Sequence, residues 1–335
     1  MPTDCDLKKP NLFQIATKEL SQDGFLTWLI KWADDCYSVV EPELNAVAKD
    51  FVRMLLRKTS DFDISHVEAG RQWKNIDIWA EINGNIAIII EDKKDAGEHG
   101  DQLFRYLEIA TSYYLSKGFE LYPIYLKTGN YSLTQKAIIE EKGYRTICRN
   151  DILQVLSRKR IENAIVRDYV EYLKTIEEET HNYNTIERIR ASWYGSEGFY
   201  LRLEQELLPE WSDWRYVSNP SGGFQGFWYH WNETEVFPEI YIQIENSDKG
   251  IILVVKVAKE DGVPCESLYG ALPVIQKIAR EEGLSLSKPS RYRSGVTSTL
   301  AIVDHAFPVC GTLSIELFIK TLRALERTID RFCLV

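Results

Sequence analysis

The sequence has few of the features that place a protein in a functional class at once. None of its five histidines belongs to a metal-ligand pattern, since His66, His99, His181, His230 and His305 are far apart. Its six cysteines are scattered and include no C-x-x-C pair, which argues against a zinc ribbon and against a disulfide framework. A G-x-x-x-x-G-K-[ST] loop is also missing, so the chain does not hydrolyse nucleotides by that route.

Long apolar runs are absent too. No stretch of the 335 residues approaches the length that a helix needs to cross a bilayer, and the N-terminal MPTDCDLKKP has no apolar signal core. We therefore expect a cytoplasmic protein with no membrane partner. With 44% hydrophobic residues the chain can bury a sizeable core, and its length favours two domains over one.

Positive charge is also in short supply. The formal net charge is −10, whereas nucleic-acid binding gains affinity from Lys and Arg side chains that displace counterions from phosphate. This balance argues against tight, nonspecific and unassisted binding to nucleic acid. It leaves such binding open where a local basic patch, a metal ion or a protein partner supplies the missing positive charge.

One stretch, 75–108, organises the rest of the chain. Its sequence, NIDIWAEINGNIAIIIEDKKDAGEHGDQLFRYLE, contains a short apolar run around Asp77, an Asn83-Gly84 turn signal and a second apolar run, 86–90. This order predicts a strand, a tight reversal and a second strand that is covered on both faces. The second strand ends in four charged residues, 91–94, and a buried strand that ends in charges usually ends at a site.

The alternation of side chains along a strand decides which of these charges act together. Glu91 and Lys93 point to one face of the strand, and Asp92 points to the other. A two-residue loop at Asn83-Gly84 would place Asp77 on the face opposite Glu91. A loop with an odd number of residues places Asp77 on the same face as Glu91. We expect the odd loop, and with it two carboxylates and an amine at one point.

Two converging carboxylates beside an amine suit a hard divalent cation. Mg²⁺ binds through one or two carboxylates together with phosphate and water, and a nearby lysine can orient or help to deprotonate an attacking water. These are the requirements of phosphodiester hydrolysis. An acid followed by E-x-K on adjacent strands of a hairpin resembles the PD-(D/E)XK nuclease superfamily, with Ile76 in the place of the proline that often precedes the acid.

The segment after the hairpin extends the resemblance. Asp101 is predicted to cap a helix in which Gln102 and Tyr106 lie one turn apart. Gln102-x-x-x-Tyr106 is similar to the motif that follows E-x-K in exonucleases of the superfamily, and the N-terminal sequence resembles a bacterial stand-alone branch. The run LYPIYL, 121–126, is predicted to form the next strand. The resemblance implies an α/β fold with a restriction-endonuclease-like core of helix, mixed β-sheet, helix and strand.

The resemblance also implies roles for the residues of these motifs. Asp77 and Glu91 would bind Mg²⁺ or Mn²⁺, with the Asp92 carbonyl as a further ligand, and Lys93 would position water. Gln102 and Tyr106 would order the site or the substrate backbone.

Acids outside the motifs have two interpretations. On the N-terminal helical stretch, 11–33, Glu19 lies where the superfamily often carries a third acid near the metal, and Asp23 is a weaker substitute. An exposed helix glutamate is the common alternative. Glu68, at the start of the first predicted strand, is another acid that could face the cluster, although such an acid is more often solvated.

Several basic residues also have both a functional and a structural interpretation. Arg71 and Lys74 precede Asp77, and Lys94 follows E-x-K, so these three would contact phosphate, or they are solvated loop charges. His99 lies in the loop after E-x-K and would either approach the cleft or remain at the surface.

The second half of the chain has a different composition. A charge-mixed helical segment, 162–180, runs into a predicted linker, and we place a domain boundary after residue 182, between a nuclease-like domain, 1–182, and an α+β domain of unknown role, 183–335. Strands are predicted near 226–231, 240–244 and 250–258, and helices near 266–281 and 312–332. The many aromatic residues are more consistent with a core than with a base-stacking surface. Arg291 and Arg293, in the loop 288–293, are the better candidates for phosphate contacts.

These features predict a Mg²⁺- or Mn²⁺-dependent nuclease whose partner is nucleic acid. DNA is preferred over RNA, and restriction or phage defence is the expected setting, because the resemblance implies both. Two alternatives stay open. One is a regulatory protein that keeps the fold without turnover, and the other is an effector that is silent until a ligand or partner engages the C-terminal domain. The expected protein partner is a different protein or a second copy of the chain in a homodimer, and the negative charge slightly favours the effector.

Overall fold

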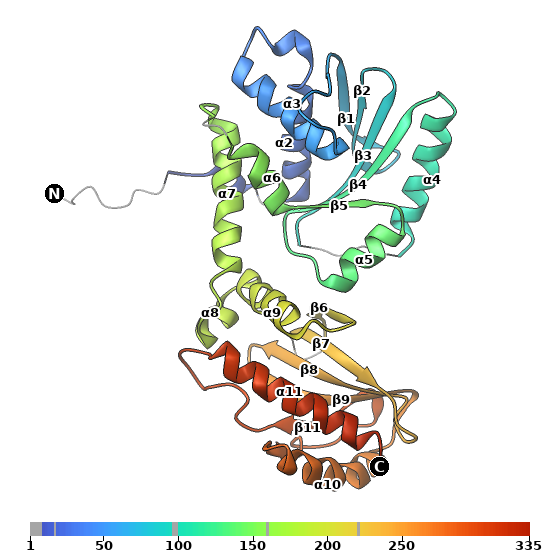
Figure 1. The fold of residues 1–335 in the computed structure, drawn as a ribbon, viewed down its shortest axis with the longest axis vertical. Helices are drawn as coiled ribbons and strands as arrows, with labels where there is room; N and C mark the ends of the chain where they lie inside the picture. The colour runs from blue at the N-terminus through green and yellow to red at the C-terminus, as the bar shows by residue number, and fades with distance from the viewer. Residues whose placement is uncertain (1–8, 17, 96–99, 159–160, 220–221) are drawn as a thin grey trace, which may run out of the picture. The chain divides into compact units, whose positions relative to one another are not determined.

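The chain divides into two compact units. The computed structural model describes residues 9–16, 18–95, 100–158, 161–219 and 222–335 (Figure 1). The first unit comprises Met1–Tyr131 and Gln135–Glu178, and the second comprises Ser132–Thr134 and Glu179–Val335. The division therefore falls near the end of helix α7 (Ala164–Thr180), whereas the sequence places it in the loop that follows this helix. No helix among the described residues is long and apolar enough to span a membrane.

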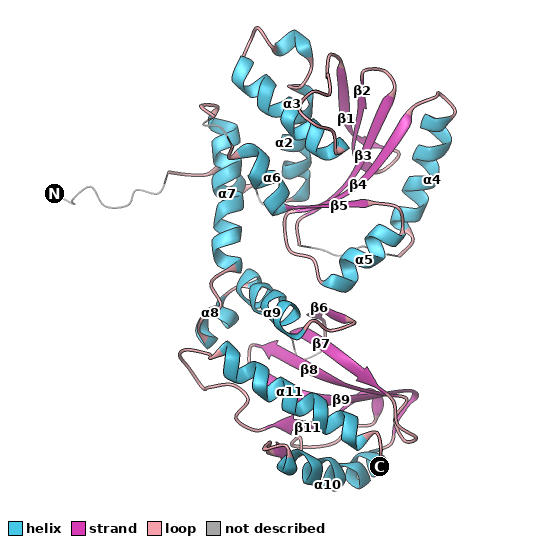
Figure 2. Cartoon of the chain, viewed as in Figure 1, coloured by secondary structure: helices cyan, strands magenta, loops and turns pink. Residues whose placement is uncertain are grey.

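A mixed five-stranded sheet forms the centre of the first unit (Figure 2). The strand order follows the chain, the first three strands are antiparallel, and the last two join by parallel pairing. The strands are β1 (Val67–Trp73), β2 (Ile76–Ile82), β3 (Ile86–Lys93), β4 (Glu120–Lys127) and β5 (Arg145–Cys148). The mixed pairing follows from the connections, because β2 and β3 form a hairpin while helix α4 (Gln102–Leu115) links β3 to β4.

Helices cover both faces of this sheet. In Figure 1, α2 (Glu19–Lys31) and α3 (Pro42–Leu56) lie on one side of the sheet and α4 lies on the other. Apolar residues at helical spacing, Leu44, Val47, Phe51 and Leu55, form the buried side of α3. The remaining helices are α1 (Leu12–Ile15), the short 3₁₀ helix η1 (Asp35–Tyr37), α5 (Leu133–Glu141), α6 (Arg149–Leu156) and α7.

Strand β3 is buried along its whole length. All eight of its residues, the three terminal charged ones included, are shielded from solvent. This confirms that the apolar run 86–90 belongs to a strand covered on both faces, and each fully buried isoleucine there stabilises the fold by about 1.5–3 kcal/mol. The same burial forces the charges at the end of the strand to find partners.

The loop between β2 and β3 has an odd number of residues, as predicted. Ile82 pairs with Ile86, so the connection is Asn83, Gly84 and Asn85, and the register continues to Ile78 opposite Ile90. Asp77 and Glu91, the next residues along each strand, therefore fall opposite one another. Asn83 and Gly84 adopt left-handed φ angles of 53° and 70°, which asparagine and glycine tolerate better than other residues.

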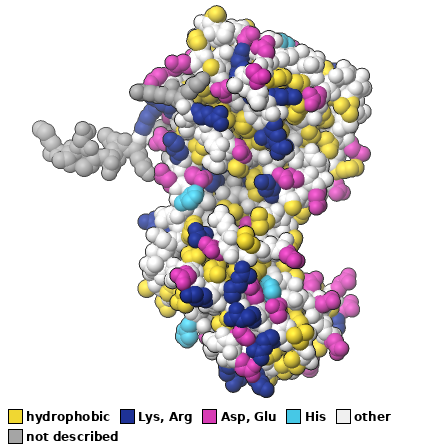
Figure 3. Space-filling model, in the orientation of Figure 1, with side chains coloured by type: hydrophobic (Ala, Val, Ile, Leu, Met, Phe, Trp, Pro, Cys, Tyr) yellow, Lys and Arg dark blue, Asp and Glu magenta, His cyan; other side chains and the backbone are white. Residues whose placement is uncertain are grey.

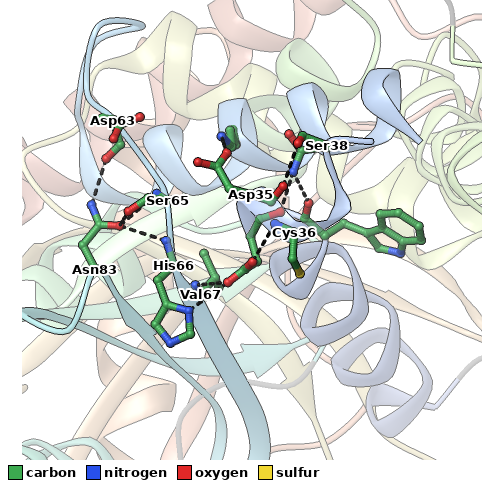
Figure 4. Close-up of polar contacts among 12 residues, drawn as sticks. Asp35, Cys36, Ser38, Asp63, Ser65, His66, Val67 and Asn83 are labelled. Carbon is green, nitrogen blue, oxygen red and sulfur yellow. Dashed lines mark hydrogen bonds and ion pairs between the residues drawn. The ribbon is translucent and has the colours of Figure 1, made fainter. Parts of the chain in front are cut away.

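Contacts outside the hairpin hold this turn in place (Figure 4). The Asn83 side-chain oxygen accepts hydrogen bonds from the backbone N–H groups of Ser65 at 3.0 Å and His66 at 3.2 Å. Its amide nitrogen donates to the carbonyl of Asp63 at 2.9 Å. The segment that leads into β1 thus fixes the turn, and with it the register that brings Asp77 opposite Glu91.

Parts of the first unit differ from the sequence-based expectation. Helix α5 and strand β5 are not predicted, because the sequence there indicates only a Gly143-Tyr144 turn. β5 is a four-residue edge strand, RTIC, with little apolar alternation to reveal it. Asp101 occupies the N-cap position of α4, but its side chain forms no capping hydrogen bond, so the predicted capping was wrong.

The second unit contains a six-stranded antiparallel sheet with helices packed against it. Its strand order is β10-β11-β9-β8-β7-β6. The elements are α8 (Ile186–Ala191), α9 (Trp193–Leu207), β6 (Ser212–Val217), β7 (Phe224–Asn232), β8 (Glu239–Ser247), β9 (Gly250–Val263), α10 (Cys265–Glu281), β10 (Leu286–Ser287), β11 (Gly295–Val303) and α11 (Ile315–Phe332). The predicted fold class, with its second α+β domain, is confirmed. The sequence does not predict β6, β10 or β11.

Most aromatic residues of the second unit are core residues, as expected. Phe199, Tyr200, Trp214, Phe227 and Tyr229 all belong to its buried hydrophobic cluster. A minority remains at the surface, Trp211 and Tyr216 among them. The interleaved aromatic sequence therefore reflects packing between helices and sheet more than a continuous stacking platform.

Candidate active site

The ends of β2 and β3 bring Asp77, Glu91 and Lys93 together. The Lys93 ammonium donates to Glu91 Oε1 at 2.5 Å and lies 3.7 Å from Asp77 Oδ2. It also donates to the Asp92 carbonyl oxygen at 3.2 Å. The ammonium therefore lies among the three expected metal ligands, which are the two carboxylates and the Asp92 carbonyl. Asp77 Oδ2 is itself fixed, because it accepts a hydrogen bond from the Asp92 backbone N–H at 3.0 Å.

Helix α4 adds the glutamine and tyrosine of the second motif. Gln102 Nε2 donates to Glu91 Oε1 at 2.6 Å and lies 3.3 Å from the Tyr106 hydroxyl. Both residues lie on the same side of α4, one turn apart, where the helix faces the sheet. Glu91 Oε1 therefore receives hydrogen bonds from both Lys93 and Gln102, while Tyr106 reaches the site only through Gln102.

Glu19 lies at the edge of this group. It is the first residue of α2, and its Oε1 accepts a hydrogen bond from the Lys94 backbone N–H at 3.0 Å. The negative charge of Glu19 contributes to the field at Lys93. The structure thus places Glu19 beside the end of β3, where it holds the backbone that follows E-x-K.

Asp92 faces away from these groups, toward α2, as strand alternation predicts. Its Oδ1 accepts a hydrogen bond from Gln22 Nε2 at 2.7 Å, and Gln22 Oε1 accepts one from the Thr128 hydroxyl at 3.0 Å. Sequence reasoning missed Gln22 and Thr128. The spacing of Gln22, three residues after Glu19 on one helix, is a signal that could have identified it. Thr128 follows β4, and the parallel pairing of β3 and β4 brings it to this site.

Burial perturbs the acids on both faces of the strand. Burial raises the pKa of Glu91 to about 7, the nearby negative charge of Asp77 adds to the rise, and the bond from Lys93 opposes it. On the other face, burial raises the pKa of Asp92 well above its usual range, and the adjacent Asp23 carboxyl raises it further. Burial also raises the pKa of Asp23, to about 6, so both carboxyl groups on this face of the strand favour the protonated form more than a free aspartate does.

Lys93 remains a cation in this environment. Burial acts to lower its pKa, but the hydrogen bond and charge of Glu91, together with Asp77, outweigh burial and raise the pKa. The side chain is therefore a donor, and its proton is held more tightly than that of a free lysine.

A model of the PD-(D/E)XK nuclease superfamily matches residues 10–186. This range covers more than half of the 335 residues and contains every element of the mixed sheet. The chain belongs to the PD-(D/E)XK nuclease superfamily. The resemblance inferred from the acid, E-x-K and their order is thereby confirmed. No curated protein and no solved structure matches the chain significantly.

Nucleases of the PD-(D/E)XK superfamily generally use divalent metal ions, and the residues here fit such an ion. Glu91 is only 2% exposed, and its Oε2 is buried with no hydrogen-bonding partner among the described residues. A buried carboxylate oxygen without a partner is costly unless something binds it. The described residues contain no cluster of three or more His, Cys, Asp or Glu side chains arranged to hold an ion. The donors are instead two carboxylates and one carbonyl, an all-oxygen set that suits Mg²⁺ or Mn²⁺ with water and phosphate as further ligands.

The basic residues nominated for nucleic acid lie in different places. Arg71 is exposed and donates to the Leu20 carbonyl at 2.9 Å, and Lys74 is exposed in the turn between β1 and β2. The Lys94 ammonium lies 5.4 Å from the centre of the Tyr172 ring. Arg291 and Arg293 belong to the second unit, in the exposed loop between β10 and β11.

Two further candidates do not join the site. Glu68 pairs in register with Glu81, several residues along the sheet from Asp77, and its side chain is 61% exposed beside His66. Of the two interpretations of Glu68, the structure therefore agrees with the solvated one. His99 lies outside the described residues. Gln72, which sequence reasoning missed, donates from Nε2 to Asp77 Oδ1 at 3.3 Å.

Proposed function

We propose that this chain is a Mg²⁺- or Mn²⁺-dependent nuclease that hydrolyses phosphodiester bonds of DNA. The observation that carries the proposal is the convergence of Asp77, Glu91 and Lys93, together with a buried oxygen of Glu91, Oε2, that has no hydrogen-bonding partner among the described residues. Membership of the superfamily supports the reaction class. The Q-x-x-x-Y helix supports it independently, because Gln102 contacts the same carboxylate.

Asp77, Glu91 and the Asp92 carbonyl would hold the cation. When bound there, a divalent cation supplies stabilisation of the negative charge that develops on the phosphate. The hydrogen bond from Gln102 fixes the Glu91 side chain so that Oε1 is satisfied and Oε2 is left for the ion. The backbone N–H of Asp92 fixes Asp77 in the same way.

Lys93 acts as a donor rather than as a base. Its ammonium donates to Glu91 Oε1 at 2.5 Å and to the Asp92 carbonyl at 3.2 Å, beside the groups that would hold the ion, so it would orient the attacking water or a phosphate oxygen by hydrogen bonding. This geometry supports the positioning role for Lys93.

The net negative charge of the chain repels the phosphates of the proposed DNA substrate. Lys and Arg side chains are interspersed with Asp and Glu across the face shown in Figure 3, in keeping with the net charge of −10. Arg71, Lys74 and Lys94 are the candidates for phosphate contacts in the first unit, and Arg291 and Arg293 in the second. The resemblance to bacterial stand-alone nucleases supports DNA as the substrate and restriction or phage defence as the setting.

The test is cleavage of linear, circular and single-stranded DNA and of RNA with Mg²⁺, Mn²⁺ or a chelator. The native chain is compared with Asp77→Asn and Lys93→Ala, and metal binding is measured separately by calorimetry. We expect metal-dependent cleavage of DNA that both variants lose. Glu68→Gln is the matched control, because it removes an exposed strand acid outside the site and should cleave like the native chain.

Cleavage that persists in Asp77→Asn would overturn the assignment of the site. Absence of both cleavage and Mn²⁺ binding in the native chain would overturn the proposed function. Mn²⁺ binding through Asp77 without any cleavage would instead favour an effector that awaits a ligand or partner.

A further inference from the structure

The second unit contains a pocket of about 760 Å³ that the nuclease proposal does not use. It is lined by the end of α9 and the loop that follows, by the end of β7, by Glu239 at the start of β8 and by residues of α11. Pockets of roughly 300–1,000 Å³ with aromatic walls and a few polar groups are typical of small-molecule sites. The chemistry of the lining residues indicates which class of ligand fits.

Two tryptophans form an aromatic wall of this pocket. Trp211 packs edge to face against Trp231 with ring centroids 4.1 Å apart, and Trp231 stacks on Tyr241 at 5.2 Å. Trp211 remains 45% exposed, although most aromatic residues of this unit are buried. An indole held in place by a second indole and still open to solvent is a preformed surface for a ligand.

The backbone beneath this wall is strained. The pairing of β7 with β8 shifts between Tyr229 and Asn232, and His230 within this shift has a left-handed φ of 61°. Such a conformation is unfavourable for a residue other than glycine and persists only where the surroundings impose it. The hydrogen bond between His230 Nε2 and Asp330 Oδ1, at 2.8 Å, helps to hold it.

The charge of the lining is negative. Three carboxylates, Glu210, Glu239 and Glu326, face one guanidinium, that of Arg323. Arg323 is already engaged, because it donates to the Leu207 carbonyl at 2.8 Å and to Glu326 Oε2 at 2.9 Å. Glu210 and Glu239 form no ion pair with any residue that the structure describes. The carbonyl end of α9 adds a partial negative charge.

We propose that this pocket binds a small organic cation with an alkylated ammonium group, which lies over the exposed indole of Trp211 and is balanced by Glu210 and Glu239. A cation is attracted more strongly to the face of a tryptophan ring than to the faces of other aromatic rings. The same carboxylates would repel a ligand that carries phosphate. A nucleotide of a nucleic-acid strand carries phosphate, so the observations favour a small cation over a base of such a strand stacked on Trp211.

The binding test uses the full chain without metal or nucleic acid, so its outcome does not depend on nuclease activity. Choline and tetramethylammonium are titrated by calorimetry, with 3,3-dimethylbutan-1-ol as the uncharged isostere of choline and with adenosine as a neutral heteroaromatic. We expect choline to bind at least about tenfold more tightly than its isostere, which corresponds to about 1.4 kcal/mol.

Two surface variants locate the binding. Trp211→Ala and Glu239→Gln should each weaken choline binding by about fivefold or more. Both residues are exposed, so neither change is expected to disturb folding, and thermal unfolding checks this. The matched controls are Tyr269→Ala and Glu235→Gln, which remove an exposed aromatic ring and an exposed carboxylate outside the pocket and should leave binding unchanged.

Three results would overturn the proposal. Equal binding of choline and its isostere would remove the role of charge. Tighter binding of adenosine than of either cation would assign the pocket to a neutral base. A lack of binding of both cations at concentrations well above about 1 mM, or the same affinity in Trp211→Ala, would show that the pocket is not a cation site.

Discussion

Each of the two units contains a glutamate, a lysine and a glutamine in hydrogen-bonding contact, yet only one of the two groups resembles a site. In the first unit, Glu91 accepts from Lys93 at 2.5 Å and from Gln102 at 2.6 Å. In the second, Glu245 accepts from Lys256 at 3.4 Å and from Gln243 at 2.8 Å. Residue types and pairwise contacts are therefore insufficient to identify a site.

Burial and the second acid make the difference. Glu91 is 2% exposed and lies opposite Asp77, and one of its oxygens has no hydrogen-bonding partner among the residues that the structure describes. The Glu245 and Lys256 side chains are 20% and 13% exposed, and Lys256 also donates to the Thr299 hydroxyl. The first group has a surplus of buried negative charge that calls for a cation, whereas the second is satisfied by its own neighbours.

Removing the lysine from each group should have the largest effect on stability. Lys93→Ala leaves two carboxylates in a buried site without their cation, so we expect the free energy of unfolding at pH 8 to fall by about 3–5 kcal/mol. Lys256→Ala breaks a more exposed pair and should cost less than about 1 kcal/mol. Urea unfolding measures both. Excess Mn²⁺ should restore stability to Lys93→Ala alone, and equal losses in the two variants would refute the contrast.

Replacing the acids of each group by amides should affect DNA cleavage in the first group and not in the second. Glu91→Gln and Asp77→Asn should lower the rate of DNA cleavage by about 10²–10³-fold or more, because each removes a ligand and a charge from the proposed site. Glu245→Gln should cleave at the native rate. A comparable loss in Glu245→Gln would mean that the second group takes part in the reaction after all.

A buried glutamate of the second unit should make the free energy of unfolding depend on pH. Burial raises the pKa of Glu204 to about 7, although the Ser212 hydroxyl donates to it at 2.8 Å. Because the folded-state pKa lies above the unfolded value of 4.5, the fold loses stability as pH rises from about 4.5 to about 7 and loses no more above it. Glu204→Gln should abolish this loss, up to about 3 kcal/mol, in unfolding experiments at pH 5 and pH 8. An unchanged pH profile would contradict the assignment.

The two glutamines should give the smallest contrast. Gln102→Ala frees the Glu91 side chain to move, so we expect Mn²⁺ affinity or cleavage to fall by about 10–100-fold. Gln243→Ala removes the corresponding bond to Glu245 and should leave both unchanged. If Gln102→Leu behaved like the native chain, the hydrogen bond to Glu91 would have no role in holding the proposed ligand.

Much of the first unit could be predicted from local signals. The apolar run 86–90, the Asn83-Gly84 turn and the helical spacing of Gln102 and Tyr106 each reflect short-range geometry, and the structure brings the residues of these motifs together as that geometry requires. The sequence did not predict β5 and α5, because an edge strand and a surface helix need little periodicity of apolar residues. The sequence placed Glu68 at the start of β1 but could not decide between its two interpretations, because pairing with β2 sets the register of β1.

The sequence by itself determined the order of acid, turn and E-x-K, and through strand alternation it determined that Asp92 points away from Glu91 and Lys93. Only the tertiary structure decided that Gln22 and Asp23 lie beside Asp92 and that Thr128 binds Gln22. It also decided that one Glu91 oxygen has no hydrogen-bonding partner in the part of the chain that the structure describes, and that two indoles and three carboxylates share a pocket in the second unit. The reason is physical. Alternation and turn geometry act over a few residues, whereas burial and charge balance depend on segments that are distant in the chain and meet only when the sheets are packed.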